Sequence, residues 1–366
     1  LTTLEAGSGF DDMAPLTAMI GDARVVSLGE TAHLNGSFYK VKHRLVEFLV
    51  TQMGFTVFAI EAPFGCASRV NAYIHGSENV PRDALNALAF TAWRTEEVLD
   101  MLIWMREYNA SHENRLKFYG FDNKPVFDAA RVVYDYLNTT SSNTAYNGLL
   151  LDWTTGQFDP YQQDRIASVT PDVEDLIAYL EGRRPASGQD HPKWRFVVQN
   201  AEVLLQHLEF WGSISAISEA SDMRDRHMAD NVNWIIDFEE GAKTVLWAAN
   251  AHITSLPGAG CMGEYLRRTY GDDMIVIALI SNRRIPAPPG GEGREAGTGT
   301  LEAFLAQAGL EISMIDFRSM PKGIVADYFN SPVRSVQGVK TIYPLSYDAV
   351  LFVESTHEAE PLARKE

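Results

Sequence analysis

A strand, a helix and a second strand follow one another near the start of the chain, and this order constrains the fold more than any other feature. Arg24–Leu28 is a short run rich in β-branched residues, as is typical of a buried strand. Ser37–Gln52 carries apolar residues at helical spacing, and Gly54 ends the run. Phe55–Ile60 is a second apolar strand. Two strands joined through a helix lie parallel with a right-handed crossover, so the sequence predicts an α/β fold.

The same alternation continues along the chain. Glu96–Asn109 is a predicted amphipathic helix, and further strand-like runs are Leu116–Phe121, Thr244–Ala249, Met274–Ile280 and Ala349–Val353. Between about residues 125 and 240 the strand-like runs stop, and helical patterns dominate at Asp172–Glu181, Trp194–Trp211 and Met223–Phe238. We expect residues 1–366 to form a single α/β core with a mainly parallel central sheet flanked by helices. Residues from about 125 to 240 are expected to be a largely helical insertion that forms one wall of a cleft.

Charge and cysteine content restrict the partners of the chain. With 31 Lys and Arg against 48 Asp and Glu, the formal net charge is −17, which argues against binding to nucleic acid or to anionic lipid. No apolar stretch reaches the roughly 18 residues that a membrane span requires. The two cysteines, Cys66 and Cys261, lie far apart and have no CxxC partner, which favours a reduced, cytoplasmic setting. Nothing in the sequence indicates a cofactor.

Polar residues come directly after the predicted strands. In open α/β sheets, ligands bind beyond the carboxyl ends of the strands. Four predicted strands deliver polar side chains to that edge, namely Glu30, His33, Glu61, Asp122, Asn250 and His252. We therefore expect a site that is assembled from distant parts of the chain.

The residue types at this edge suggest hydrolysis by an activated water. Glu30 stands three residues before His33, and a carboxylate beside an imidazole fixes its tautomer and stabilises its protonated form. His252 could orient the water or protonate a departing alkoxide. The sequence has no G-x-S-x-G elbow, and Cys66 has no base near it in sequence. The predicted catalytic residues are His33, Glu30, Glu61 and His252.

Each of these residues also has a simpler interpretation on its own. Glu61 could cap a helix, His252 could be a hydrogen-bonded core histidine, and Asp122 could be structural. Arg224 could point into the cleft or pair with acidic neighbours. Trp93 is predicted at a pocket rim, and Asp222 is a candidate N-cap of a helix that begins at Met223. Five other histidines are expected at the surface: His75, His112, His191, His207 and His357.

The ordered set of motifs resembles the erythromycin esterase family. The resemblance runs nearly end to end and is carried by Val25–His33, Ser37-Phe38, Lys42–Leu45, Gly54–Glu61, Leu102–Asn109, Phe118–Asp122, Met223–Ala229, Ala249–His252 and Tyr347–Val350.

This resemblance implies a metal-independent hydrolase that opens the lactone ring of a macrolide such as erythromycin, a small-molecule ester substrate. By position, His33 matches the family's proposed general base, and Glu30, Glu61 and His252 match its other active-site residues. One position departs from the family, because Lys42 stands where the family has an arginine and lacks the planar guanidinium fork. We expect Lys42 or Arg224 to stabilise the oxyanion, and Trp93 and Asp122 to complete the substrate-binding set.

Three alternatives remain open at this stage. The same four residues could hold a metal in a metal-dependent hydrolase, which a strong chelator would inactivate. The fold could also carry a biosynthetic enzyme acting on another polyketide-like substrate, which the mass of the product would reveal. A non-catalytic protein that binds a small molecule would show binding without turnover.

Overall fold

The predicted alternation of strands and helices is confirmed along the chain. The computed structural model describes residues 1–77, 80–140, 145–159, 161–185, 188, 190–286 and 293–362. The strands are β1 (Val25–Leu28), β2 (Val57–Pro63), β3 (Lys117–Asp122), β4 (Thr244–Trp247), β5 (Met274–Ile285), β6 (Arg294–Glu295), β7 (Ile312–Asp316), β8 (Val333–Arg334), β9 (Lys340–Thr341) and β10 (Ala349–His357).

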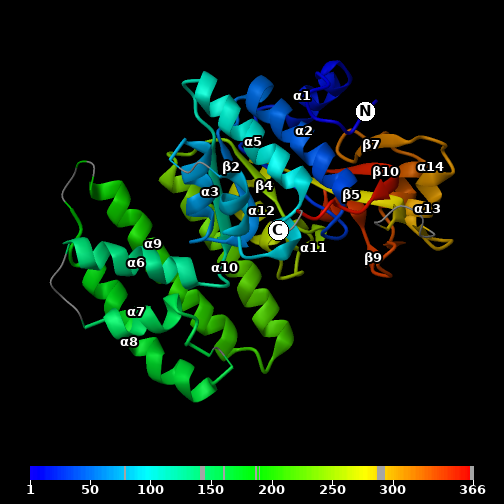
Figure 1. Cartoon of the computed structure of the whole chain (residues 1–366). Helices are drawn as coiled ribbons and strands as arrows, with labels where there is room; N and C mark the ends of the chain where they lie inside the picture. The colour runs from blue at the N-terminus through cyan, green and yellow to red at the C-terminus, as the bar shows by residue number, and fades with distance from the viewer. Residues whose placement is uncertain are drawn as a thin grey trace.

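The helices of the core surround these strands, and a second group fills the middle of the chain. The core helices are α1 (Ala14–Ile20), α2 (Gly36–Met53), α3 (Ala67–Ile74), α4 (Pro81–Asn86), α5 (Glu96–Ser111), α11 (Asn250–Ile253), α12 (Met262–Tyr270), α13 (Leu301–Ala306), α14 (Ile324–Phe329) and α15 (Tyr343–Ser346). The middle group is α6 (Phe127–Thr140), α7 (Asn147–Thr154), α8 (Gln163–Glu181), α9 (Asp190–Gly212) and α10 (Ile217–Phe238). Figure 1 shows α6 to α9 lying to one side of the sheet, with α10 leading back to it.

The central sheet is mostly parallel. Its strands follow the order β3-β2-β4-β1-β5-β10-β7, and β6 pairs with β5 at one end of that long strand. All neighbours from β3 to β10 are parallel, whereas β7 and β6 are antiparallel to their partners. The first strand of the chain, β1, therefore lies between β4 and β5, in the middle of the sheet.

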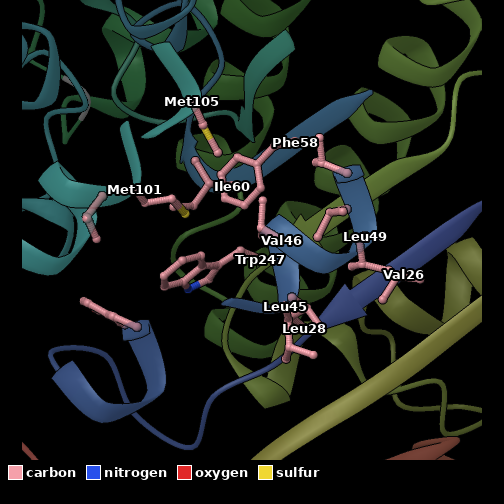
Figure 2. Packing of buried hydrophobic residues seen from close by; sticks show 14 of the residues in the cluster. Val26, Leu28, Leu45, Val46, Leu49, Phe58, Ile60, Met101, Met105 and Trp247 are labelled. Carbon is pink, nitrogen blue, oxygen red and sulfur yellow. The ribbon is translucent and has the colours of Figure 1, made fainter. Parts of the chain in front are cut away.

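Each face of the sheet is covered by its own apolar cluster. Val26 and Leu28 of β1 point into the cluster formed with α2 and α5, while Val25 points into the cluster formed with α10 and α12. This alternation follows from the two-residue period of a strand. Figure 2 shows the first cluster, in which the ring of Trp247 of β4 packs against that of Phe58, with the ring centres 6.1 Å apart. Burial on both faces explains why these strands read as continuous apolar runs.

Local signals set the ends of α2, which carries Lys42. The side chain of Asn35 caps the helix by accepting a hydrogen bond from Phe38 N at 3.1 Å. Gly54 ends it in the left-handed region, with a φ of 74°. The start of α10 differs from the prediction, because the helix begins at Ile217 and places Asp222 inside it instead of at its N-cap. Within the residues that the structure describes, none of the helices combines the length and apolar character of a membrane span.

Candidate active site

Gly29 allows the end of β1 to pass directly against α11. A Cβ atom at this position would lie 2.0 Å from Asn250 Oδ1 and 2.6 Å from Ile253 Cδ1, so a larger residue would force these side chains to move. The backbone N–H of Asn250 donates to the carbonyl oxygen of Glu30 at 2.8 Å. The loops that follow β1 and β4 are therefore held side by side at the carboxyl edge of the sheet.

Glu30 is fully buried and accepts hydrogen bonds from three side chains. Its Oε1 atom lies 2.6 Å from His33 Nδ1. Its Oε2 atom lies 2.9 Å from Lys42 Nζ and 3.1 Å from Trp247 Nε1. Burial lowers the pKa of Lys42 to about 8, although the neighbouring carboxylate opposes this effect. Glu30 is thus fixed in one orientation before any ligand binds.

His33 presents its other ring nitrogen to the edge of the sheet. Because the carboxylate of Glu30 can only accept a hydrogen bond, Nδ1 of His33 carries the proton. Nε2 is therefore left free to accept. Nε2 lies 3.9 Å from Glu61 Oε2, and the side chain is 37% exposed. Burial lowers the pKa of His33, but the hydrogen bond to Glu30 and the charges of Glu30 and Glu61 outweigh burial and raise it.

Glu61, in β2, lies between the two histidines. Its Oε1 atom is 3.3 Å from His252 Nε2 and 3.0 Å from Arg224 Nη2. Its Oε2 atom faces His33 and accepts a hydrogen bond from Ala249 N at 3.1 Å. Burial raises the pKa of Glu61, but the contacts with His252 and Arg224 outweigh it and hold the pKa well below its usual range. One carboxylate therefore faces both imidazoles.

Arg224 reaches this carboxylate from α10. Its Nε and Nη2 atoms bind Asp122 at 3.1 and 2.6 Å, and Nη1 lies 3.1 Å from His252 Nε2. The bidentate pairing fixes the plane of the guanidinium. Burial lowers the pKa of Arg224, but Asp122 and Glu61 outweigh burial and raise it. The side chain remains 14% exposed, so part of the cation faces outward.

His252 is held from both sides of its ring. Nδ1 lies 2.8 Å from Asp225 Oδ1, which also accepts from Met262 N at 2.9 Å. Nε2 can accept from Arg224 when the ring is neutral or donate to Glu61 when it is protonated. Burial and the charge of Arg224 favour the neutral ring. The two carboxylates outweigh them and raise the pKa of His252 to about 10.

Two cavities adjoin the loop that follows β1 and carries His33. One, of about 710 Å³, is lined by Thr31 and Ala32, which precede His33, and by Arg284. The other, of about 230 Å³, is lined by Thr31, Asn250 and Ala251. Gln337 borders both cavities, and its Nε2 atom donates to the carbonyl oxygen of Thr31 at 2.6 Å.

Comparison with known proteins decides the family. The family described as erythromycin esterase matches residues 50–356. The chain belongs to the erythromycin esterase family. It is 25% identical over 361 residues to erythromycin esterase type II of Escherichia coli, covering 86% of this chain and 85% of the relative.

Solved structures of similar proteins share the fold. A succinoglycan biosynthesis protein superposes with a TM-score of 0.81 at 22% identity, covering 98% of this chain and 95% of that one. A mutant of the erythromycin esterase EreC in its open conformation gives a TM-score of 0.70 at 18% identity, with 97% and 96% covered. The mainly parallel α/β sheet with a helical stretch is thus the architecture of this esterase family.

The structure brings together the four residues that the sequence and the family resemblance single out. Glu30, His33, Glu61 and His252 meet at one edge of the sheet, although they come from three separate segments of the chain. Arg224 joins them through Glu61 and also pairs with the acidic side chain of Asp122. These contacts place the residues; their catalytic roles remain proposals.

Three predicted substrate-binding residues of this esterase-family chain are buried instead of lining a cleft. Lys42 is fully buried, with Nζ bound to Glu30 and 4.4 Å from the centre of the Trp247 ring. Trp93 is also fully buried. Its indole N–H donates to the carbonyl oxygen of Glu61, and its ring packs edge-on against that of His33, with the ring centres 5.2 Å apart. Asp122 is fully buried against Arg224. All three lie in the protein interior and hold the polar residues of the site in position through these contacts.

Two residues of the site were missed in the sequence. Asp225 was hidden because it directly follows Arg224 in a run of alternating charges, where its partner could not be deduced. Trp247 reads as an apolar strand residue, and only its indole N–H reveals a polar role toward Glu30. The expectation of a surface position for His207 was wrong, since its side chain is buried.

Across the described ranges, no three His, Cys, Asp or Glu side chains are arranged to hold a metal ion. The position that a cation would take among Glu61, Asp122 and His252 is filled by the guanidinium of Arg224. The polar centre of this esterase-family protein is thus built around a protein cation.

Proposed function

We propose that this protein is a metal-independent carboxylic ester hydrolase in which His33 activates a water molecule. The observation that carries the proposal is that His33 and His252 face opposite oxygens of the single carboxylate of Glu61. Family membership supports a small-molecule ester as the substrate.

In this proposal His33 is the general base. Glu30 fixes the proton on Nδ1, so that Nε2 can take a proton from water while the carboxylate stabilises the resulting imidazolium. The greater exposure of His33 supports this role, because water must reach Nε2. Hydroxide then attacks the ester carbonyl.

Arg224 and His252 would handle the negative charge that develops. Arg224 is fixed by Asp122 and partly exposed, so its guanidinium can stabilise the oxyanion, and it takes this role in place of the buried Lys42. With a pKa raised to about 10, His252 is protonated at neutral pH and can give its proton to the departing alcohol. Asp225 would hold the ring in place during that transfer.

The arrangement of Arg224 supports a reaction without a metal, because its guanidinium already neutralises the buried carboxylates. Prolonged dialysis against a strong chelator should leave the ester-cleaving activity unchanged. Loss of activity that returns with a divalent cation would favour the metal-dependent alternative.

The finer proposal is that the substrate is a macrolide lactone such as erythromycin, so that ring opening would confer resistance to the antibiotic. The 710 Å³ cavity, which is lined by Thr31 and Ala32 of the loop that carries His33, supports a bulky ligand. We also propose that residues from about 125 to 240 form a wall of the substrate cleft on the single core.

The two free cysteines support a cytoplasmic location.

Mass spectrometry tests this proposal. The metal-stripped protein is incubated with erythromycin, larger macrolides and simple esters, and hydrolysis adds one water to the substrate. Products without added water would indicate a biosynthetic reaction of another class. Tight binding with no product from any of these compounds would overturn the proposal of an enzyme.

A further inference from the structure

A third cavity, which we call the aromatic pocket, lies among the helices of the middle group. It measures about 380 Å³, within the range of sites that hold small organic ligands. Its wall is mostly aromatic and is formed by Phe90, Lys124, Pro125, Val126, Phe127, Trp153, Gly156, Phe158, His207 and Trp211. Among the described residues, no carboxylate lines it, although the protein as a whole is strongly acidic.

Two short chain segments connect the aromatic pocket to the active site. Phe90 stands three residues before Trp93, whose ring contacts His33 at 5.2 Å. Lys124 stands two residues after Asp122, which binds Arg224. The charges of Arg224, Asp122 and Glu61 all act on the ammonium group of Lys124, although burial is the main cause that lowers its pKa. A ligand in the aromatic pocket would therefore lie within a few residues along the chain of the side chains that contact His33 and Arg224.

The aromatic pocket offers a specific acceptor. His207 Nδ1 lies 3.2 Å from the carbonyl oxygen of Asn123, which can only accept, so Nδ1 carries the proton. Burial lowers the pKa of His207 to about 4 and keeps the ring neutral. Its Nε2 atom has no hydrogen-bond partner within the part of the chain that the structure describes. A ligand hydroxyl group can supply the missing donor.

The indole groups add two buried donors. The Nε1 atoms of Trp153 and Trp211 are buried and have no acceptor among the described residues. Unpartnered buried donors cost stability, and both indole groups belong to residues that line the aromatic pocket. A protonated amine finds no counter-charge among the described residues of the wall, where Lys124 is itself a cation.

We propose that the aromatic pocket binds a neutral, apolar ring of the ester substrate that carries a hydroxyl group. That the ligand is a substrate rests on the proposed ester hydrolysis. Binding of such a ring to the pocket can be measured whether or not an ester is cleaved. The ring packs against Trp153 and Phe158, whose own rings lie 5.1 Å apart, and its hydroxyl donates to His207 Nε2.

Calorimetric titration of the wild-type protein with naphthol tests binding alone, since naphthol has no ester bond. Phe158→Ala and Phe127→Ala should each weaken binding about tenfold, as loss of part of an aromatic contact predicts. Phe127 is 43% exposed, so its removal spares the core. Phe304→Ala on α13, which removes a similarly exposed ring outside the aromatic pocket, is the matched control and should bind naphthol as the wild type does.

The polar part of the proposal has its own comparison. Wild-type protein should prefer naphthol over methoxynaphthalene, which cannot donate, and over protonated naphthylmethylamine. His207→Phe keeps an aromatic ring and should abolish the preference for naphthol over methoxynaphthalene. If Phe158→Ala and Phe127→Ala bind naphthol as tightly as the wild type does, the proposal is overturned, even if ester hydrolysis is found. Tight naphthol binding with no ester cleavage would instead overturn the proposed function and leave the pocket as a binding site.

Discussion

The two histidines of the active site have the same side chain but different surroundings. His33 is 37% exposed, and a carboxylate binds one of its ring nitrogens while the next carboxylate is 3.9 Å away. His252 is 17% exposed, and Asp225 and Glu61 lie within 3.3 Å of its two nitrogens. The second environment stabilises the imidazolium more, which is why the pKa of His252 reaches about 10. Different environments on the two sides of Glu61 are what the proposed roles require, with His33 as proton acceptor and His252 as proton donor.

Replacement of His33 should have the largest effect on activity, because it removes one of the two histidines that are compared. His33→Asn removes the proposed base, and we expect turnover to fall by roughly a thousandfold, because general-base catalysis contributes about that much. Turnover of a lactone and of a simple ester would be measured, with circular dichroism to confirm the fold. His112→Asn, at the exposed C-terminal end of α5, is the control and should keep full activity. Near-normal turnover in His33→Asn would reject the assignment.

Arg224 lies beside His252, and its loss should have the next largest effect. Arg224→Lys keeps the charge but cannot bind Asp122 and Glu61 together in one plane. We expect kcat to fall about a hundredfold with little change in KM, because an oxyanion contact acts in the transition state. Arg226→Lys, on the exposed face of α10, should change neither constant. A selective rise in KM would show that Arg224 serves ground-state binding instead.

Asp225 can be used to make the two histidines more alike. Asp225→Asn removes a carboxylate from His252 Nδ1 and should lower the pKa of that ring. Activity that needs protonated His252 is lost as pH rises through this pKa, so the alkaline limb of the kcat profile should move to lower pH by about one unit. Asp230→Asn on the same helix is the control. An unmoved limb would show that another group controls it.

The smallest expected effect concerns stability. The pKa of His252 is raised from 6.5 to about 10, so its stabilising contribution is complete below pH 6.5 and is lost as pH rises toward 10. In the wild type, this contribution to the free energy of unfolding, at most a few kcal/mol, should decline across that window. Denaturant unfolding at several pH values should show a flatter decline in His252→Gln. Parallel curves for the two proteins would contradict the raised pKa.

The sequence by itself determined the sheet and the edge at which the site forms. Apolar runs that end in Glu30, Glu61 and Asp122 encode buried parallel strands, and parallel strands bring their carboxyl ends to one edge. Fold class and the meeting of distant polar residues therefore follow from local pattern and chain direction. The helices α8 to α10 follow in the same way, from the helical periodicity of their sequences.

Tertiary structure decided which polar groups face outward and which support them. Lys42, Trp93 and Asp122 look like site-lining residues in sequence, but they lie in the interior behind Glu30, His33 and Arg224. Asp225 and His207 have no sequence signal of their roles, because these depend on contacts between α10 and α11 and between α9 and the loop after β3. Spacing along a chain fixes the face that a side chain occupies on its own element. The partner across the interface is fixed only when the elements pack.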